Sequence, residues 1–550
     1  MSKILMVTML AAAFILSAAA DNSVSRNLVW GYPAYSTAFA EPSNWYLATG
    51  EHQSVVVSDE HPDSSPGFAD TVRFYSRGGV TSAAADNTVT LSGNGAVSNF
   101  IYVVTADSGK LTIDFARYTL DVTGEVHFLT RSYASSSMLC LKDGTLRQFG
   151  TWTGKKSQWG EMEESYPGIF LNRQNAQNSG GNVTFDNMTV DARSGRTPEF
   201  RWNTLQGHTH HLIFTNGTQF LCNNLIIVPS TTEVFVGGED TRIAVDDGVY
   251  NAGDHSLFSL TMDAASRVAF ADGATLCAGQ LRVGGSGTLV FDGGRHELLA
   301  GNHWGDVGTL VAEGGTVILT NGASVAYARK MENYGVIVRN GATLIVGEGC
   351  SLTNARDNCW FRAGSVGGGY SSKFGSTTVV DGGTILASWV DFGCKEALSN
   401  HVLRIKGPQS YIAQTKSTEW GSARAMSFNY GAGIEFEFPA EGYHDANGVS
   451  RAPIKAAGCF GSTAGTVARP IYIKLNTRAF DRAHPEESLT LMQATAKTDN
   501  KSHDTSAFYA KLLENIVWEN AYHGELTVSE DGKSLLYTAP PKRGLMLIFR

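Results

Sequence analysis

The sequence predicts an all-β protein built as a parallel β-solenoid. In residues 287–383, a short β-branched run repeatedly ends in an acidic residue or asparagine followed by glycine. Each run is typical of a strand, and each Asp-Gly or Asn-Gly pair supplies the positive φ of a tight turn. The steps from Gly273 to Gly293 and on to Gly314 are about 20 residues, a repeat length typical of solenoids. Glycine is abundant, at 60 of 550 residues, and charged residues are scarce, at 17%, which disfavours a helical protein.

Residues 1–20 have the features of a secretory signal peptide. Lys3 precedes an uncharged apolar stretch, and small residues precede Asp21. The apolar stretch is too short to span a membrane, and no later run of 18 apolar residues follows. The alternative is a buried N-terminal helix. We expect an exported protein, in the periplasm, at the cell surface or outside the cell, with no transmembrane segment in the mature chain.

Residues 21–80 are predicted to form an irregular N-terminal cap. They contain Asn44-Trp45 and then Pro66-Gly67, Asp70 and Phe74 in the spacing Pro-Gly-x-x-Asp-x-x-x-Phe. This segment resembles the start of secreted bacterial β-helix proteins with autotransporter-type passenger repeats. The resemblance implies a right-handed parallel β-helix and implies no activity. The chain departs from that family because residues 401–543 lack the long alternating strands of a translocator barrel.

Residues 81–406 are predicted to be the stacked coils of the β-helix. One coil cannot bury its apolar face alone, so the coils stabilise each other. Residues 147–178 have little strand character and are expected to form a loop inserted between coils. Loops of this kind are where solenoids usually bind partners, and aromatic rings stack on sugars. We therefore expect any glycan recognition to be weak and centred on Trp152 and Trp159.

Residues 407–550 are predicted to form a small mixed cap over the last coils. A helix is expected at residues 506–516, capped by Asp504 or Ser506. A strand pair is expected at residues 524–528 and 534–537. Such a cap would cover the strand edges that an open solenoid end exposes.

Charge and cysteine content exclude several other classes of protein. The net charge of −9 has no basic stripe, which argues against nucleic acid as a partner. The seven cysteines are an odd number without a C-x-x-C pair, so no zinc site is expected. Cys350 and Cys359 are expected either to close a small loop as a disulfide or to lie reduced in the core.

Two catalytic functions on the same scaffold have partial support, and the first is a hydrolase. Hydrolysis with inversion needs paired carboxylates. Asp246-Asp247 and Arg404-Ile405-Lys406 match isolated fragments of the pectin-hydrolase pattern, but its Asn-Thr-Asp and Gly-His-Gly elements are absent near them. Both fragments are short enough to occur by chance, and Asp247 also fits a turn before Gly248.

The second is a lyase, which would need a base beside a cation that neutralises a uronate. Arg282, Arg295, His296 and His303 are close in sequence and could lie on adjacent coils, although solvated loop residues are the better explanation. A pair of histidines in the 208–211 run could hold a metal ion, but no third ligand is evident, so we expect no metal and no cofactor.

Two functions therefore remain. The favoured one is a non-catalytic, secreted or cell-surface β-solenoid with a structural or adhesive role, whose partners are polysaccharides or cell-surface glycans. The alternative is a polysaccharide-active lyase or glycoside hydrolase on a β-helix scaffold, with Asp246, Asp247, Arg282 and His296 as its candidate catalytic residues. Carboxylates and a cation that converge from neighbouring coils would distinguish the enzyme.

Overall fold

The computed structural model forms two compact units, Met1–Tyr250 and Asn251–Arg550. It describes residues 25–30, 37–49, 56–75, 87–104, 110–130, 138–148, 168–171, 181–192, 200–202, 210–222, 226–228, 232–245, 259–262, 266–299, 308–327, 335–354, 357–364, 374–394, 399–419, 422–423, 425–462, 470–498 and 503–542. In these residues the protein is all-β, with long parallel sheets of many strands, as the sequence predicts. No helix among the described residues is long and apolar enough to cross a membrane.

Unit 1 is built from parallel ladders of short strands. One ladder contains β1 (Asn27–Trp30), β4 (Thr71–Tyr75), β7 (Asn99–Val104), β10 (Glu125–Thr130), β12 (Gly168–Leu171), β14 (Phe200–Trp202) and β17 (Ile226–Val228). The other strands are β5 (Asn87–Thr90), β6 (Gly95–Val97), β8 (Lys110–Asp114), β9 (Thr119–Val122), β11 (Met138–Gln148), β13 (Gly181–Ala192), β15 (His210–Thr215), β16 (Gln219–Cys222), β18 (Thr232–Gly237) and β19 (Arg242–Val245). At the start, β2 (Trp45–Thr49) pairs antiparallel with β1 and with β3 (Val56–Val57), after the 3-10 turn η1 (Pro42–Asn44).

The core of unit 1 contains a stack of phenylalanines from successive repeats. Phe74 and Phe100 have ring centroids 5.3 Å apart, and Phe185 and Phe214 lie 5.0 Å apart with nearly parallel rings. Phe128 connects these two pairs because its ring packs on both Phe100 and Phe185. Since equivalent residues of a parallel ladder lie directly above one another, an aromatic residue at one inward position packs on its counterpart in the next repeat.

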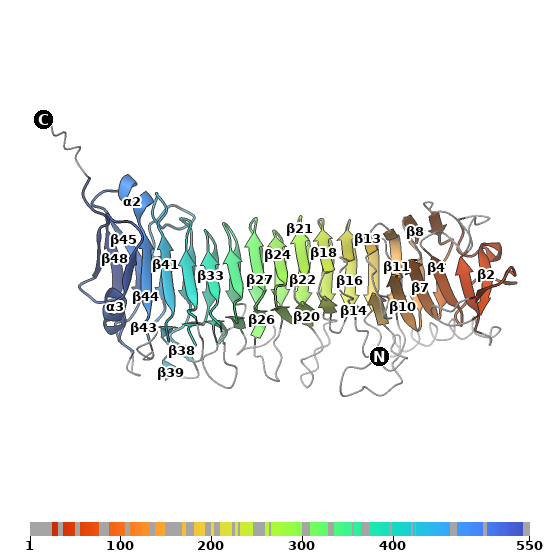
Figure 1. Ribbon diagram of the computed structural model, residues 1–550, viewed down its shortest axis with the longest axis horizontal. Helices are drawn as coiled ribbons and strands as arrows, with labels where there is room; N and C mark the ends of the chain where they lie inside the picture. Colours follow the sequence, from red (N-terminus) through yellow and green to blue (C-terminus); the bar gives the residue numbers. More distant parts are fainter. Residues whose placement is uncertain are drawn as a thin grey trace, which may run out of the picture. The chain divides into compact units, whose positions relative to one another are not determined.

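Unit 2 has three parallel ladders, and Figure 1 labels β24, β27, β33, β41 and β44 in one ladder, whose arrows point the same way. The first ladder contains β20 (Ser259–Met262), β23 (Gln280–Gly284), β26 (Gly308–Glu313), β29 (Gly335–Arg339), β32 (Trp360–Ala363), β35 (Trp389–Phe392), β40 (Met426–Phe428) and β43 (Phe460–Gly461). The second contains β21 (Arg267–Ala271), β24 (Thr288–Asp292), β27 (Thr316–Thr320), β30 (Thr343–Val346), β33 (Thr377–Val380), β36 (Val402–Ile405), β41 (Gly433–Glu437), β44 (Tyr472–Asn476) and β46 (Ile516–Trp518). The third contains β22 (Thr275–Ala278), β25 (Arg295–Leu298), β28 (Ser324–Tyr327), β31 (Ser351–Asn354), β34 (Thr384–Ala387), β37 (Tyr411–Gln414), β42 (Ile454–Ala456) and β45 (Ser488–Ala494).

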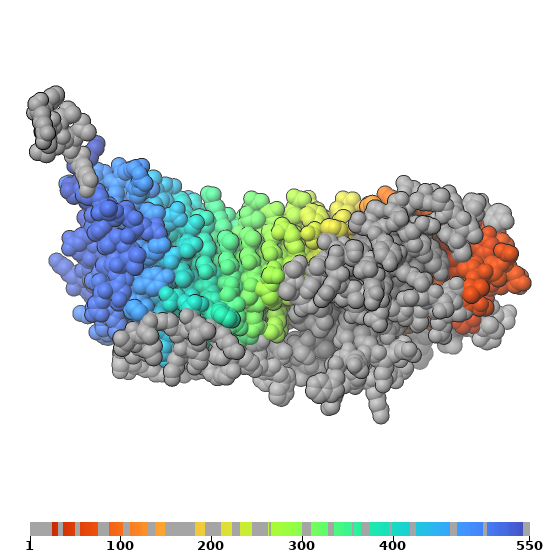
Figure 2. All heavy atoms as spheres, viewed as in Figure 1, coloured from red at the N-terminus to blue at the C-terminus, as the bar shows by residue number. Residues whose placement is uncertain are grey.

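The strands of unit 2 alternate between buried and partly exposed residues. In β27, Val317 and Leu319 are fully buried while their neighbours are partly exposed. Val317 pairs with Leu289 of the preceding repeat and with Leu344 of the following one, and both are buried. Full burial of one such side chain contributes about 1.5–3 kcal/mol, so the stack of inward residues holds the repeats together. In Figure 2 the repeats of unit 2 form adjoining bands whose colour follows the sequence from green to blue.

The repeat is longer and less regular than the spacing of the turn glycines predicts. Thr288 pairs with Thr316, and Thr316 pairs with Thr343, so each of these repeats exceeds the predicted step. The next repeat along the same ladder is longer still. Gly293 lies in the turn between β24 and β25, whereas Gly314 lies between β26 and β27. The predicted step from Gly273 to Gly293 joins equivalent corners and agrees with the pairing of Arg267 with Thr288, whereas the step from Gly293 to Gly314 joined two different corners that share the same turn chemistry.

The turns themselves have the backbone that the sequence predicts. Asn321 and Gly322 have φ of 51° and 74°, and Asn340 and Gly341 have φ of 54° and 87°. Asparagine and glycine are the residues that adopt this left-handed conformation most readily. The Asn321 amide also donates to the carboxylate of Asp292 in the preceding repeat, so the turns are linked along the stack.

Parallel pairing continues beyond residue 406, where the sequence predicts the capping region to begin. β36 pairs with β41, β41 with β44, and β44 with β46, which ends at Trp518. The predicted strand pair is present as β47 (Glu525–Val528) and β48 (Ser534–Thr538), and β48 pairs antiparallel with β45. Among the remaining elements, α2 (Arg478–Ala483) follows β44, and β38 (Thr418–Glu419) pairs with β39 (Ser422–Ala423).

The predicted C-terminal helix is present as α3 (Thr505–Leu513). Its N-cap is Asp504, whose carboxylate accepts hydrogen bonds from the backbone N–H groups of Ser506 and Ala507. Phe508 of this helix stacks on Phe428 at 5.7 Å and on Phe460 at 5.6 Å. The helix therefore adds its own ring to the aromatic stack inside unit 2.

Candidate functional site

Four of the six residues singled out from the sequence lie outside the described residues. They are Trp152, Trp159, Asp246 and Asp247. The other two, Arg282 and His296, are described, and the structure places them in different surroundings. Arg282 lies on β23 with its side chain partly exposed, whereas His296 lies on β25 in the core. They belong to different ladders and do not form the catalytic cluster that a lyase would require.

Arg282 has a partner on the neighbouring strand. Its Nη2 atom lies 2.7 Å from Oε2 of Glu313, and Arg339 approaches the same oxygen at 3.1 Å. Asn340 donates to the second carboxylate oxygen at 3.0 Å. Burial alone would raise the pKa of Glu313, but the hydrogen bond and charge of Arg339, together with Arg282, outweigh burial and lower it. The group is a charged link between strands.

His296 is buried with both ring nitrogens engaged. The Leu276 N–H donates to Nδ1 at 3.2 Å, and Nε2 lies 2.9 Å from the carbonyl oxygen of Gly293. The ring also packs on Phe291, with centroids 4.3 Å apart. Burial lowers the pKa of His296 to about 4, against the opposing effect of the Gly293 hydrogen bond. A neutral imidazole that is 1% exposed cannot reach a substrate.

His211 and the seven cysteines, which were also considered from the sequence, are among the described residues. Nδ1 of His211 is 3.2 Å from Oε2 of Glu233, and both side chains are exposed. Among the described residues, no group of three or more histidine, cysteine or carboxylate side chains is placed to hold a metal ion. All seven cysteines are buried, and the disulfide considered for Cys350 and Cys359 is not formed.

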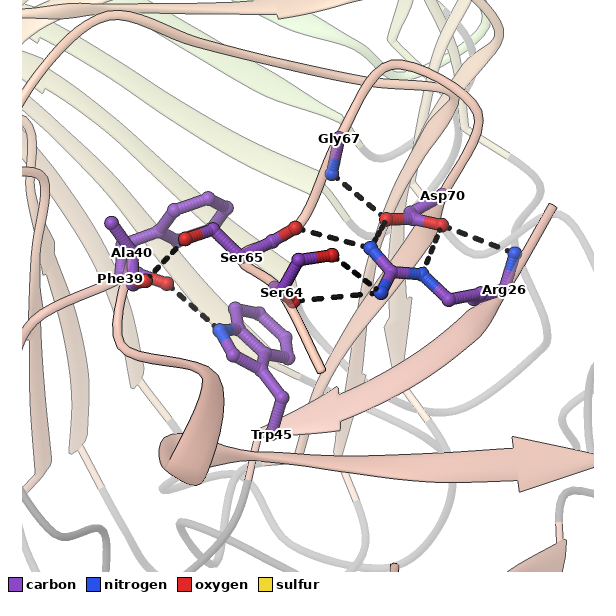
Figure 3. Close-up of polar contacts among 8 residues, drawn as sticks. All are labelled: Arg26, Phe39, Ala40, Trp45, Ser64, Ser65, Gly67 and Asp70. Atoms are coloured by element: carbon purple, nitrogen blue, oxygen red, sulfur yellow. Dashed lines mark hydrogen bonds and ion pairs between the residues drawn. The ribbon is translucent and has the colours of Figure 1, made fainter. Parts of the chain in front are cut away.

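The N-terminal motif has a structural role, shown in Figure 3. The carboxylate of Asp70 accepts from the Gly67 N–H at 2.8 Å, which closes the Pro-Gly turn. It also accepts two hydrogen bonds from the Arg26 guanidinium, at 3.0 and 2.6 Å, and one from the Arg26 N–H at 3.1 Å. Asp70 is 2% exposed, and a buried carboxylate needs such charged hydrogen bonds. Its arginine partner, Arg26, was not identified from the sequence.

The remaining contacts of this cluster attach the irregular segment to the first strands. Arg26 donates to Ser64 Oγ at 3.0 Å and to the Ser65 carbonyl at 3.1 Å. Trp45 donates from Nε1 to the Phe39 carbonyl at 2.8 Å and packs on Phe74 at 5.4 Å. The motif residues thus connect the start of unit 1 to β4, and every polar atom named here is used for that purpose.

The described part of unit 2 presents a charged hollow of about 150 Å³. It lies on the outward side of β36, β41 and β44 and next to the end of β46. Three cations, three carboxylates, an amide and one phenylalanine line it: Arg404, Lys406, Lys474, Glu435, Glu437, Glu519, Asn476 and Phe436.

Strand register explains why opposite charges meet in the hollow. Arg404 pairs with Glu435, and Glu435 pairs with Lys474, so the charge alternates from strand to strand. The Nε and Nη2 atoms of Arg404 lie 2.9 and 2.7 Å from Oε2 of Glu435. Tyr472 donates to Oε1 of the same carboxylate at 3.1 Å. Burial, with the adjacent charge of Glu435, raises the pKa of Tyr472 to about 12, so the phenol remains a donor.

The other two ion pairs of the hollow differ in length. Lys406 and Glu437 form an ion pair at 3.5 Å, and the Glu437 side chain is 56% exposed. Lys474 and Glu519 form a closer pair at 2.5 Å. The carboxylates of Glu435 and Glu437 project from one face of β41, at alternate positions of the strand. This set offers hydrogen-bond donors and acceptors side by side at an accessible surface.

Sequence reasoning noticed Arg404-Ile405-Lys406 but could not identify its partners. The period-2 patterns Glu435-Phe-Glu437 and Lys474-Leu-Asn476 indicate outward polar faces of strands. However, the segments between these three strands are unequal in length, so no fixed spacing along the chain aligns them.

Comparison with known proteins leaves the family of the chain open. No protein-family model matches it, and no curated protein or solved structure is significantly similar to it.

Proposed function

We propose that the protein is an exported, non-catalytic β-solenoid with a structural or adhesive role toward glycans. The observation that carries the proposal is the use of outward charges to link neighbouring strands. Besides the pairs in the hollow, these links include Lys142–Asp114, Arg147–Asp121, Arg282–Glu313 and Arg362–Asp391. Single exposed ion pairs stabilise little, but a series of them along a ladder favours one register over its neighbours.

The finer architecture belongs to the same proposal. We infer a right-handed parallel β-helix, since parallel crossover connections are right-handed in about 98% of cases. The antiparallel strands β2 and β3 would cap its N-terminal end, and α3 with β47 and β48 its C-terminal end. The resemblance of the Asn44-Trp45 and Asp70 motif to secreted β-helix proteins supports the first cap. An experimental structure with antiparallel sandwich sheets would overturn this architecture.

Export rests on the signal-like residues 1–20. N-terminal sequencing of the protein recovered from cells that secrete it should begin at Asp21. Recovery of the intact chain, starting at Met1, from the cytosol would contradict the proposal.

A polysaccharide hydrolase remains the competing function because Glu435 and Glu437 share one face of β41. Alternate residues of a strand are about 6.6 Å apart, near the carboxyl separation of about 6.5–9.5 Å in inverting glycosidases. Each carboxylate is, however, in an ion pair with a cation from β36 or the residue after it. A general acid must be free to give a proton to the leaving group, whereas both carboxylates here are engaged in ion pairs between strands.

A turnover screen separates the two functions. The mature protein is incubated with plant, algal and host polysaccharides, and products are read as reducing ends and as absorbance of unsaturated sugars. We expect retention of the protein on some immobilised glycans without release of product. Robust turnover that is abolished by changing Asp246, Asp247, Arg282 or Glu437 would establish the enzyme instead.

A further inference from the structure

We propose that the hollow on β36, β41 and β44 is a binding site for one unit of a neutral saccharide. The inference rests on the proposed adhesive function and assigns it a place and a ligand chemistry. It differs from the expectation that Trp152 and Trp159 would be the centre of recognition.

The charge balance of the hollow selects a neutral ligand. Its three cations and three carboxylates form ion pairs with one another, so their formal charges cancel. An acidic or basic sugar would have to separate one of these pairs and leave a partner uncompensated, which costs binding free energy. A hydroxyl group can donate to a carboxylate and accept from an ammonium group at the same time, so it can bridge a pair without breaking it.

The size of the hollow selects a single ring. Its volume of about 150 Å³ leaves room for several water molecules. Pockets that enclose drug-sized ligands are larger, about 300–1,000 Å³. Hydroxyl groups of one sugar ring can replace ordered waters and keep their hydrogen bonds to the wall.

The loosest pair marks the side from which the sugar enters. Lys406 and Glu437 are 3.5 Å apart, and Glu437 is the more exposed of the two. Glu435, in contrast, is fixed by Arg404 and Tyr472. We therefore place the ring hydroxyls between Lys406, Glu437 and Asn476, with Glu435 as the rigid floor.

The test uses the mature protein and three sets of soluble probes. The neutral probes are cellohexaose, xylohexaose, mannohexaose and maltohexaose; the acidic probe is trigalacturonate and the basic probe is a chitosan oligomer. Binding is measured by ligand-observed saturation-transfer NMR and by titration calorimetry. We expect millimolar binding of at least one neutral probe and weaker binding of the acidic and basic ones.

Three variants locate the site. Glu437→Gln and Lys406→Gln remove one charged hydrogen-bond partner each, and Asn476→Phe fills the hollow. Each should weaken neutral binding at least about 10-fold. For Glu437→Gln and Lys406→Gln this is the usual effect of losing a charged hydrogen bond. For Asn476→Phe the reason is that the ring fills the space of the ligand. Arg147→Gln is the matched control: it removes an ion pair with Asp121 whose arginine side chain is 48% exposed, outside the hollow. It should bind as the unmodified protein does.

The outcomes separate this site from the proposed function. No binding of any neutral probe, tighter binding of a charged probe, or binding that Asn476→Phe leaves unchanged would each overturn the site. In the last case the adhesive function would stand with its ligand elsewhere on the chain. Turnover of a probe would overturn the non-catalytic function itself.

Discussion

Replacement of His296 by glutamine should remove a specific source of acid sensitivity. The imidazole is buried in contact with Phe291, and both of its nitrogens have backbone partners. Above pH 6.5 the ring is neutral in both the folded and the unfolded chain, so its full contribution to stability is present. As the pH falls toward about 4, the unfolded chain takes up a proton that the folded chain cannot accept.

The size of the effect follows from the two pKa values. The fall from 6.5 to about 4 is roughly 2.5 units, and each unit corresponds to 1.36 kcal/mol, so the loss of stability is about 3 kcal/mol. Glutamine has both a donor and an acceptor and does not titrate. The free-energy cost of packing glutamine at this position does not depend on pH. Only the change in the free energy of unfolding with pH therefore reports on the imidazole.

The assay is denaturant unfolding at several pH values between 7 and 4, with amide hydrogen exchange of β24 and β25 as a local readout, because repeat proteins can unfold in parts. The free energy of unfolding of the unmodified protein should fall by about 3 kcal/mol relative to His296→Gln over this range. His211→Gln, at an exposed position, controls for the loss of an imidazole. A difference that stays constant from pH 7 to 4 would refute the buried, neutral state of His296.

Four further changes test other parts of the structure. Asp70→Asn should destabilise the first strands of unit 1 by about 2 kcal/mol, because it weakens the charged hydrogen bonds of Arg26. Limited proteolysis should then cut residues 25–75 faster, and an unchanged rate of cleavage would contradict the prediction. Phe508→Ala should lower the free energy of unfolding by about 3–5 kcal/mol, because it leaves a cavity between Phe428 and Phe460. Thermal unfolding of unit 2 measures this; a fall in melting temperature no larger than that of Phe374→Ala, at an exposed position, would count against it. Gly393→Ala should reduce soluble expression, since φ is 108° and a Cβ would lie 1.9 Å from the Asn429 carbonyl; normal yield and melting would argue against that close approach. A chain ending at residue 406 should aggregate because it exposes the edge of β36, which β41 covers in the intact protein; a soluble monomer in gel filtration would rule this out.

Local elements of this protein follow from local sequence. The strand pair expected at residues 524–528 and 534–537 is present as Glu525–Val528 and Ser534–Thr538, and Asp504 caps α3 as its position before the helix indicates. Asn321-Gly322 and Asn340-Gly341 adopt the left-handed turn that their side chains favour. These features depend on interactions within a few residues, so one sequence suffices to predict them.

The candidate sites were harder to predict because they depend on which strands become neighbours. Asp70 was recognised as part of a motif, but its partner Arg26 lies 44 residues earlier. Arg282 and His296 looked like one cluster because they are close in sequence, yet they belong to different ladders, with one side chain outward and the other in the core. The hollow combines Arg404 with Glu435 and Lys474, whose separation no local pattern encodes.

The sequence by itself determined the class of this protein, because alternating apolar residues select strands and Asn-Gly or Asp-Gly pairs select their turns. Only the tertiary structure decided the register, since successive repeats of the same ladder differ in length: Arg267 pairs with Thr288, whereas Glu435 pairs with the much more distant Lys474. A shift of one residue would turn every inward side chain outward. Packing of the core in unit 2 chooses among these registers, and that choice places Arg404, Glu435 and Lys474 on one surface.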